Sequence, residues 1–385
     1  MSRHYLDHAS SSTLRPEGRA ALLEWLDRTA DPGRVHTEGR MVRAAIEVAR
    51  AQVADLLGVR SRAVVFTSGA TEAANTAVWG AAAAQPGGRS VLAPVEHSCV
   101  RQPATRAGEI THLPVDRVGR LPLEALQEAL DDEGGRPVSL VHCQWGNHEV
   151  GTMQPVAEVV AACRRVGVLV HVDAAQAVGR LPELDLGELG ADLVSVSAHK
   201  FGGPAGIGAL VIRRGLRLEP LLLGGDQERA RRAGMENVAA IAGFGAVAEA
   251  LGANRRARLQ LEADTARRRI EALRRVALAV DGVVVYGDED PAGRLPHLLC
   301  LGIDGVEAEA VLLGLDQAGI AAHSGSACSS EALEPSPVLE AMGVDGQRSL
   351  RLSVGWSTTD ADVSAFGSAF PAVVGRLRAL GARPA

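Results

Sequence analysis

The sequence predicts an α/β protein in which a mostly parallel sheet is followed by a smaller α+β unit. Between about residue 60 and residue 215, short apolar runs alternate with amphipathic segments, a pattern typical of βαβ units and a parallel sheet. Polar and reactive residues follow the ends of several of these runs. At 385 residues the chain is also long for a single hydrophobic core, so two domains are expected.

Six apolar runs in the first part of the chain are predicted to be strands. They cover residues 63–66, 90–93, 138–143, 168–172, 193–197 and 207–212. Helical patterns lie between several of them, at residues 73–84, 123–130 and 156–166. Ligands of parallel sheets bind beyond the carboxyl ends of the strands. The residues that follow these strands are therefore the candidates for a functional site.

The second part of the chain is predicted to form the smaller unit. A long pattern rich in Arg, Ala and Leu at residues 253–280 predicts a helix that leads into it, with its arginines on a solvated face. The remaining predicted elements are strands at 297–303, 320–323 and 349–354 and helices at 306–319 and 360–380. We expect a large domain at 14–254 and a small domain made of 1–13 and 255–385.

The composition indicates a soluble globular protein without a nucleic-acid or membrane partner. Hydrophobic residues make up 46% of the chain, charged residues make up 22%, and the net charge is −6. Aromatic residues are only 3%, which disfavours stacking platforms for single-stranded nucleic acid. No apolar run reaches the ~18 residues of a membrane span. The N-terminus lacks an apolar signal-peptide core, so a cytoplasmic location is expected.

The cysteine and histidine patterns favour neither a disulfide framework nor a metal site. The five cysteines are odd in number and widely spaced, and no C-x-x-C pair or helical H-x-x-x-H pair occurs. Cys143, Cys163 and Cys300 lie among aliphatic residues and are expected in the core. Cys328 lies instead in a loop rich in Ser, Gly and Ala, where a reactive thiol can be exposed.

Lys200 is the only lysine, because the other 39 of the 40 Lys and Arg residues are arginines. Arginine can supply a charge, an ion pair or a long stem over apolar surface. It cannot serve as a Schiff-base nucleophile, because guanidinium keeps its proton at neutral pH. Chance survival of one lysine is the alternative explanation. The position of Lys200 just after the predicted strand at 193–197 favours a chemical role.

Residues 67–72 join the strand at 63–66 to the helical run at 73–84 through a glycine turn. Such a turn presents free backbone N–H groups and the positive end of the helix dipole, which favours a bound phosphate. Thr71 can add a hydroxyl, although an ordinary helix cap by Thr71 or Ser68 is the alternative. The P-loop pattern of NTPases is absent, and the Gly-rich stretch at 202–208 precedes a strand, so we interpret that stretch as a turn.

Asp173 ends the strand at 168–172, and Lys200 follows it after the next predicted strand. A carboxylate in this position can hold a heterocyclic nitrogen protonated, which is the role required in pyridoxal 5′-phosphate (PLP) enzymes. His97 could lie flat on such a ring or move protons. A histidine that is merely hydrogen-bonded at the end of a strand remains the alternative for His97.

In order along the chain, these segments resemble the cysteine desulfurases of the NifS/IscS type, which are fold-type I PLP enzymes of the class V aminotransferase family. The resemblance runs from residue 5 to beyond residue 351. It is carried by residues 66–72, 96–97, 147–151, 171–176, 197–200 and 324–330. It implies a mostly parallel seven-stranded sheet in the large domain and a smaller α+β domain that carries a cysteine loop.

The resemblance also implies roles for the matching residues. Lys200 would bind the cofactor covalently, Asp173 would pair with its pyridine nitrogen, and His97 would stack on its ring. Gln176 and Asn147 would bond the phenolate oxygen of the ring. The further implied cofactor contacts are Ala70, Thr71, Ser197 and His199, of which the last three would hold the phosphate.

For the substrate, the resemblance implies that Arg351 binds the carboxylate of L-cysteine, with Asn147 also at the substrate. Cys328 would attack the substrate sulfur and carry it as a persulfide to an acceptor protein. The implied catalytic residues are therefore Lys200, Cys328 and His97, and the implied assembly is a homodimer. Two segments depart from the family pattern, namely residues 31–36, which begin with Asp31 in place of an asparagine, and residues 232–235, which end with Met235 in place of a threonine. In the family, that threonine contacts the phosphate bound by the partner subunit.

The expected function is conversion of L-cysteine to L-alanine with sulfur left on Cys328. One alternative is another PLP enzyme of this fold, such as a C–S lyase, a selenocysteine lyase or an aminotransferase, which needs no thiol at position 328. A non-catalytic scaffold is a second alternative, but a degenerate copy should have lost at least one of Lys200, Asp173, His97, Cys328 and Arg351. The pathway of the acceptor, for example iron–sulfur cluster assembly or tRNA thiolation, is left open.

Overall fold

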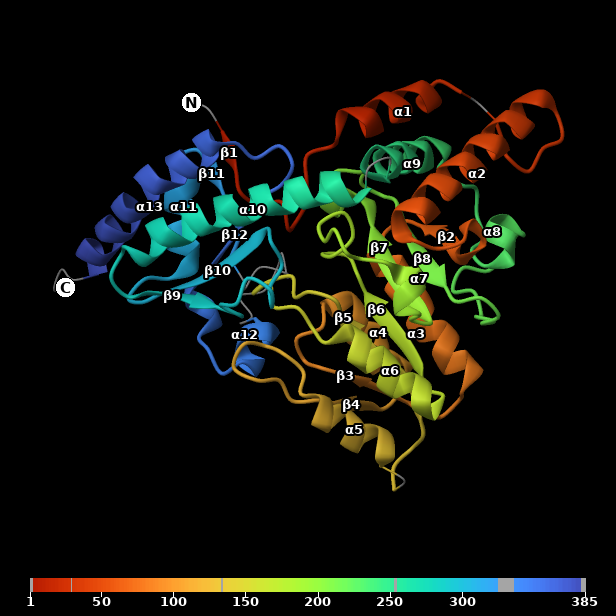
Figure 1. Cartoon of the computed structure of the whole chain (residues 1–385), viewed down its shortest axis with the longest axis horizontal. Helices are drawn as coiled ribbons and strands as arrows, with labels where there is room; N and C mark the ends of the chain where they lie inside the picture. The colour runs from red at the N-terminus through yellow and green to blue at the C-terminus, as the bar shows by residue number, and fades with distance from the viewer. Residues whose placement is uncertain (1–2, 29, 133, 253–254, 325–335, 382–385) are drawn as a thin grey trace.

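The structure is a computed structural model that describes residues 3–28, 30–132, 134–252, 255–324 and 336–381. Figure 1 shows a larger body built around a twisted sheet and a smaller body that contains the C-terminal helix. The long helix α10 (Arg255–Leu278) runs from one body to the other. Two separate clusters of buried apolar side chains form the main cores of these bodies.

Seven strands form the large sheet, in the order β2-β8-β7-β6-β5-β3-β4. β8 is antiparallel to both of its neighbours, and the other neighbouring pairs are parallel. This arrangement confirms the predicted α/β fold with a mostly parallel sheet. In the order of the sheet the strands are β2 (Val64–Thr67), β8 (Gly208–Ile212), β7 (Leu193–Ser197), β6 (Leu169–Asp173), β5 (Val138–Gln144), β3 (Arg89–Leu92) and β4 (Ile110–His112).

Helices cover both faces of the large sheet. On one face, α2 and α9 pack against each other, and their side chains share a core with the strands and with α6. On the other face, α3 packs on β5, β7 and β8, and α4 packs on α3. The helices of this body are α1 (Pro16–Leu26), α2 (Thr37–Leu57), η1 (Ser61–Ala63), α3 (Ala70–Ala84), α4 (Ser98–Ala107), α5 (Leu123–Asp131), α6 (Val156–Val166), α7 (Leu186–Leu189), η2 (Ala198–Phe201), α8 (Gln227–Ala230) and α9 (Val238–Gly252).

The alternation of side chains along a strand decides which residues reach the site. In β6, Val170 and Val172 enter the core shared with α2 and α9, whereas Leu169 packs on the α3 side. Because successive side chains point to opposite faces, His171 and Asp173 also lie on the α3 side. The same alternation puts Gln144 at the end of β5 and Ser197 at the end of β7 on that face.

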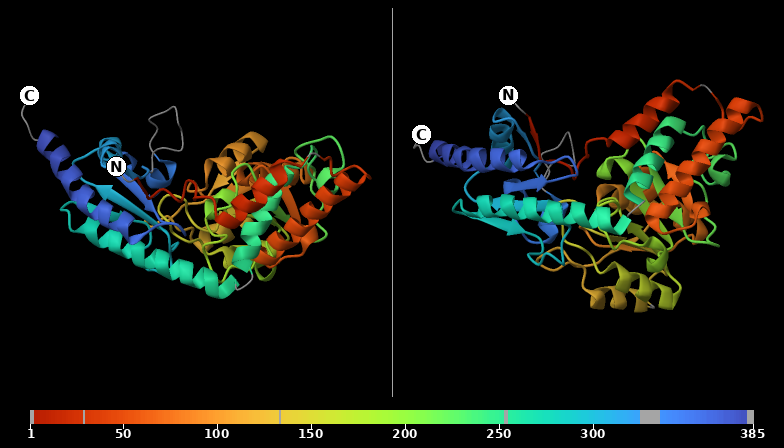
Figure 2. Two further views of the ribbon diagram at one scale, coloured as in Figure 1. Left: turned by 90° about the horizontal axis from the view of Figure 1, so that it is seen from above. Right: turned by 45° about the horizontal axis from the view of Figure 1, so that its top comes forward.

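The smaller body combines an antiparallel sheet with helices. Its sheet has the order β12-β10-β9, and a separate pair joins β1 to β11 in parallel. Helices α10, α11 and α13 pack together beside these strands (Figure 2). The remaining elements are β1 (His4–Tyr5), β9 (Val283–Tyr286), β10 (Leu298–Ile303), α11 (Ala308–Gln317), β11 (Ile320–Ala321), α12 (Pro337–Ala341), η3 (Gly346–Arg348), β12 (Ser349–Ser353) and α13 (Asp360–Gly381).

Residues 6–15 connect the two bodies. The segment is bonded to the smaller body by Leu6 N–H, which donates to Ala321 O at 2.9 Å. It then passes the turn that holds Lys200, where Ser12 N–H donates to His199 O at 2.9 Å. The N-terminal segment therefore borders the candidate site although it precedes the large sheet in sequence.

Candidate active site

A cavity of about 320 Å³ lies where β5, β6 and β7 end and where α3 and α4 begin. Its lining includes eight residues that the sequence singled out, namely Ala70, Thr71, His97, Asp173, Gln176, Ser197, His199 and Lys200. Asn147 and Arg351 are not among its lining residues, and Cys328 lies outside the described residues. The lining also includes Cys99, Gln144 and His148, to which the sequence analysis gave no individual role.

Lys200 lies in the short helix η2, directly after β7. Gly202 ends this helix with a φ of 94°, in the left-handed region that glycine adopts readily. A Cβ atom at Gly202 would also lie 2.7 Å from Cγ of Arg15, so the turn requires glycine for space as well. The Lys200 Nζ donates to Ala9 O at 2.7 Å, which brings the N-terminal segment to the reactive amine.

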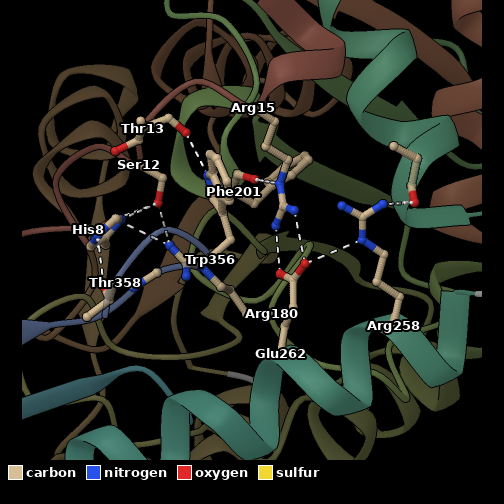
Figure 3. Close-up of polar contacts among 12 residues, drawn as sticks. His8, Ser12, Thr13, Arg15, Arg180, Phe201, Arg258, Glu262, Trp356 and Thr358 are labelled. Atoms are coloured by element: carbon tan, nitrogen blue, oxygen red, sulfur yellow. Dashed lines mark hydrogen bonds and ion pairs between the residues drawn. The ribbon is translucent and has the colours of Figure 1, made fainter. Parts of the chain in front are cut away.

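Arg180 fixes the main chain of Lys200 by a hydrogen bond to its carbonyl oxygen. Its Nη2 donates to Ser12 Oγ at 2.8 Å (Figure 3). The same Nη2 donates to Lys200 O at 2.6 Å, and Nη1 donates to Val354 O at 3.2 Å. Burial, followed by the charge of Arg15, lowers the pKa of the Arg180 guanidinium to about 10, so it stays protonated at neutral pH. A buried cation thus ties the lysine turn, the N-terminal segment and the residue after β12 together.

Arg15 makes a second connection between the two bodies. Its guanidinium donates to both carboxylate oxygens of Glu262 on α10, at 2.9 and 2.6 Å (Figure 3). Its Nε donates to Phe201 O at 2.9 Å, one residue beyond Lys200. Because two parallel charge-assisted bonds fix both direction and distance, Arg15 couples the lysine turn to the long helix of the smaller body.

Asp173 presents its carboxylate at the end of β6. Its Oδ1 accepts from Ala175 N–H at 2.9 Å and from Ser195 Oγ at 3.3 Å. Among the residues that the structure describes, no hydrogen bond to Oδ2 is found. The buried carboxylate lines the same cavity as Lys200, so it can pair with a protonated ring nitrogen there.

The N-terminus of α3 supplies an anion-binding end to the cavity. The first N–H groups of a helix lack partners within the helix and attract negative charge. Gly69 precedes the helix, and no atom lies within 4 Å of the place where a Cβ would stand, so the backbone is open to a ligand. Burial alone would raise the pKa of the Glu72 carboxyl, but hydrogen bonds from Arg232 and Ser68 outweigh it and lower the pKa.

Ser197 and His199 flank the same end of the cavity. His199 Nδ1 lies 3.3 Å from Ser11 Oγ. Burial, followed by the nearby charge of Lys200, lowers the pKa of His199 to about 4. His199 is therefore neutral at neutral pH, and it can hold a phosphate by a hydrogen bond but not by an ion pair.

His97 caps helix α4 and faces the cavity. Its Nδ1 accepts from Cys99 N–H at 3.1 Å, which leaves the proton of the neutral ring on Nε2. The preceding residue, Glu96, is fully buried, and this burial raises the pKa of its carboxyl to about 8. Glu96 Oε1 accepts from Gln144 N–H at 2.7 Å. A protonated carboxyl therefore lies beside the cavity at neutral pH.

Asn147 does not line the cavity, and its side chain bonds to the backbone around its own turn. Its side chain is fully buried, and its Oδ1 accepts from the N–H groups of Glu149 and Val150 at 2.8 Å each. Its Nδ2 donates to Val95 O at 3.2 Å. These bonds hold the turn after β5, and they engage the carbonyl oxygen of the side chain. The implied cofactor and substrate contacts of Asn147 stay predictions.

Arg351 also stands behind the cavity lining in this structure. It is 3% exposed, and its Nη1 donates to His148 O at 2.9 Å. Its Nη2 donates to Asp7 Oδ1 at 2.9 Å and to Ser10 Oγ at 2.7 Å. A substrate carboxylate would therefore have to replace Asp7 or share the guanidinium with it, and the implied substrate contact stays a prediction.

Three features of the cavity fit PLP. A lysine amine, a carboxylate for a ring nitrogen and a helix N-terminus for a phosphate all line one space.

Among the described residues no cluster of metal-binding side chains is found. Within the same described ranges, no helix is long and apolar enough to span a bilayer.

A family model for class-V aminotransferases matches residues 4–366. A cysteine desulfurase of Cereibacter sphaeroides is 39% identical over 392 residues, which cover 99% of this chain and 98% of the relative. The chain belongs to the cysteine desulfurases of the class-V aminotransferase family. The IscS-like cysteine desulfurase of Mycobacterium tuberculosis is similar too, with 38% identity over 390 residues and 97% of each chain covered.

Solved structures agree with this family. The NifS-like protein from Rickettsia africae has a TM-score of 0.87 at 30% identity, covering 97% of this chain and 99% of that one. A structure of SspA in complex with cysteine has a TM-score of 0.78 at 26% identity, covering 91% of this chain and 98% of that one. These matches confirm the predicted family and fold, and the cysteine desulfurases of this family are PLP enzymes.

Proposed function

We propose that this protein is a PLP-dependent cysteine desulfurase that converts L-cysteine to L-alanine and retains the sulfur on Cys328. The observation that carries the proposal is the meeting of Lys200, Asp173 and the N-terminus of α3 around one cavity. Each of these three groups matches a different part of PLP, and together they support a bound cofactor in a chain of this family.

The chain's own residues would divide the work at the cofactor. Lys200 binds it covalently, Asp173 keeps the ring nitrogen protonated, and the N–H groups that open α3 hold the phosphate with Thr71 and Ser197. When bound, PLP supplies an electron sink for the bonds at the substrate carbon that carries the amino group. Arg180 fixes the carbonyl of Lys200 and so positions the amine without touching the substrate.

The sulfur transfer requires a thiolate that can reach the substrate sulfur. The Cys328 thiolate attacks that sulfur, the carbon–sulfur bond breaks, and the carbon gains a proton, so L-cysteine and a thiol become L-alanine and a persulfide. The other four cysteines are buried, and burial raises the pKa of their thiols. This burial favours Cys328 over them as the nucleophile.

The substitution Cys328→Ser tests this proposal. The variant should bind PLP as the native protein does, because Lys200 and Asp173 are unchanged. It should form no persulfide and release almost no L-alanine, measured by amino-acid analysis together with a persulfide stain. Release of L-alanine near the native rate would instead indicate a C–S lyase, in which sulfur leaves without an enzyme thiol.

We further propose that the enzyme is a cytoplasmic homodimer that passes its sulfur to an acceptor protein, for iron–sulfur cluster assembly or tRNA thiolation. Large apolar side chains are exposed on and near α1 and α2, which supports a second copy covering this region. They are Leu23, Leu26, Val35, Met41 and Met235. The two separate cores support the proposed division into a large domain at 14–254 and a small domain made of 1–13 and 255–385.

A further inference from the structure

A second histidine, His148, faces the cavity beside His97. It belongs to the turn after β5 and lines the same space as Lys200. The ring centroids of His148 and His97 are 4.9 Å apart, and the two rings meet edge to face at 77°. Two imidazoles therefore border the place where a substrate would meet the lysine amine.

A buried carboxylate orients His148. The Nε2 of His148 lies 3.3 Å from Glu149 Oε1, and Glu149 is 2% exposed. The other carboxylate oxygen accepts from Ser336 Oγ, and the Glu149 N–H is held by Asn147 Oδ1. Because both its backbone and its carboxylate are fixed, Glu149 holds the ring of His148 in one orientation. A carboxylate in this position also stabilises a positive charge on the imidazole.

The two cavity histidines differ in the chemistry of their ring nitrogens. In His97, a backbone N–H from Cys99 occupies Nδ1. In His148, Nε2 instead lies 3.3 Å from a carboxylate oxygen of Glu149. No ion pair is found for His97 within the described part of the chain. A carboxylate therefore supports protonation of His148 and not of His97.

We propose that His148 is a second acid–base residue of this active site and accepts a proton from the ammonium group of the entering L-cysteine. This inference rests on the proposed function. The proton moves from the substrate nitrogen to the imidazole, which becomes an imidazolium paired with Glu149. The substrate amine becomes neutral and hence nucleophilic. The proton later returns to solvent, so the residue is restored in each turnover.

Several titratable or charged groups surround His148, and the test must separate their titrations. The titratable or charged side chains on the elements around it are Glu96, His97, Asp173, His199, Lys200 and Arg351. Glu149 differs from all of these because it lies on the same turn and its carboxylate meets the imidazole. Substitution of His148 should therefore abolish the titration of its imidazole, whereas substitution of Glu149 should shift that titration to lower pH.

The test uses the holoenzyme with His148→Asn, Glu149→Gln and the control His112→Asn, which changes an exposed histidine in the edge strand β4. Asparagine has no group that accepts a proton near neutral pH, so His148→Asn removes the proposed proton acceptor. We expect kcat/KM for L-cysteine at pH 7 to fall by about 100-fold or more in His148→Asn, the usual size of general acid–base effects. The acid limb of the pH profile that belongs to His148 should disappear, while the dissociation constant of PLP stays the same. His112→Asn should match the native enzyme.

Glu149→Gln adds a readout that does not depend on turnover. Loss of the carboxylate should lower the pKa of His148, measured by NMR titration of ring-labelled histidine in native and variant proteins. The acid limb should move to lower pH by the same amount. An unchanged pH profile in His148→Asn, or an unchanged His148 titration in Glu149→Gln, would overturn the inference. A native enzyme that releases no L-alanine would overturn the proposed function instead.

Discussion

At the scale of single residues, this site depends on a few side chains, and hydrogen bonds to distant parts of the chain hold them in place. Lys200 is the only lysine of the chain, and its amine, its carbonyl and its neighbour Phe201 are each bonded to a different group. One carboxylate oxygen of Asp173, Oδ1, accepts hydrogen bonds from Ala175 and Ser195. Such fixed first contacts are what a covalently held cofactor requires, since small displacements of a catalytic group cost large factors in rate.

Met235 carries a prediction at this scale. It is 64% exposed and does not line the cavity of its own chain, which is compatible with a position facing a partner subunit. If it replaces a hydroxyl that would reach the partner's phosphate, one hydrogen bond to a charged group is missing, worth roughly 1.5–3 kcal/mol. We expect Met235→Thr to tighten PLP binding about tenfold or more.

The measurement is the PLP dissociation constant of both proteins after removal of the cofactor. The chemical step should change little, because the phosphate stays unaltered during turnover. Equal constants would show that Met235 does not face the phosphate or that another group already fills the gap.

At the scale of elements, the strand ends were the most predictable part of the site. Asp173 and Ser197 were found from sequence because buried strands end abruptly in polar residues, and alternation puts them on one face. The short edge strands β4 and β9 and the helices α1 and α2 were not predicted. β4 has only three residues and β9 only four, which is too short for an apolar run to indicate a strand. α1 and α2 precede the part of the chain in which predicted strands and helices alternate.

Other parts of the site could not be read from sequence because their partners are distant in the chain. Lys200 bonds Ala9 across 191 residues, and Arg180 bonds a carbonyl beyond β12. No local periodicity encodes such contacts. The hydrogen bonds of Asn147 to the backbone of its own turn could not be predicted either, since the sequence shows the amide side chain but not its partners.

The buried pair His142–His171, which joins β5 and β6, gives a prediction of pH dependence. Burial lowers the pKa of His171 to about 4 and holds the pKa of His142 well below its ordinary value. Between about pH 4 and 6.5 the unfolded chain therefore binds protons that the folded chain does not, so stability falls as the pH falls. Each such histidine contributes about 1.4 kcal/mol per pH unit in that window.

Urea unfolding midpoints from pH 7 to pH 5 measure this effect, with His171→Asn as the comparison. Glu96 acts in the opposite direction, because its raised pKa stabilises the fold as the pH falls from about 8 to 4.5. It is a single group, whereas the pKa values of His8, His199 and His297 are also lowered. A midpoint that rises on acidification, or an equally steep fall in His171→Asn, would refute the account of this pair.

At the scale of the whole molecule, the site lies where two bodies and the N-terminal segment meet. Lys200 and Asp173 lie at the ends of strands of the large sheet, Arg351 of the smaller body lies behind the cavity lining, and residues 6–15 bond to both Lys200 and Arg351. Relative movement of the two bodies would therefore change the distance between Lys200 and Arg351.

The ion pair between Arg15 and Glu262 tests this coupling. Removing the charge of Glu262 leaves a buried guanidinium without its partner, which costs about 1–3 kcal/mol after allowance for the partial exposure of Glu262. We expect Glu262→Gln to lower the urea midpoint and to weaken PLP binding, because Arg15 also holds Phe201 beside Lys200.

The matched control is Glu17→Gln, which removes another carboxylate near α10. Glu17 is 40% exposed and lies 3.5 Å from Arg258, so its loss should change stability by less than about 0.5 kcal/mol. Equal effects of the two substitutions on PLP binding would contradict a specific role for the Arg15–Glu262 pair.

The visible absorption spectrum of the purified protein, before and after addition of L-cysteine, tests the central claim most directly. A cofactor bound to Lys200 should give a visible band that borohydride abolishes, and L-cysteine should change that band while L-alanine accumulates. A protein that stays colourless when supplied with PLP would contradict the account, as would a visible band that L-cysteine leaves unchanged.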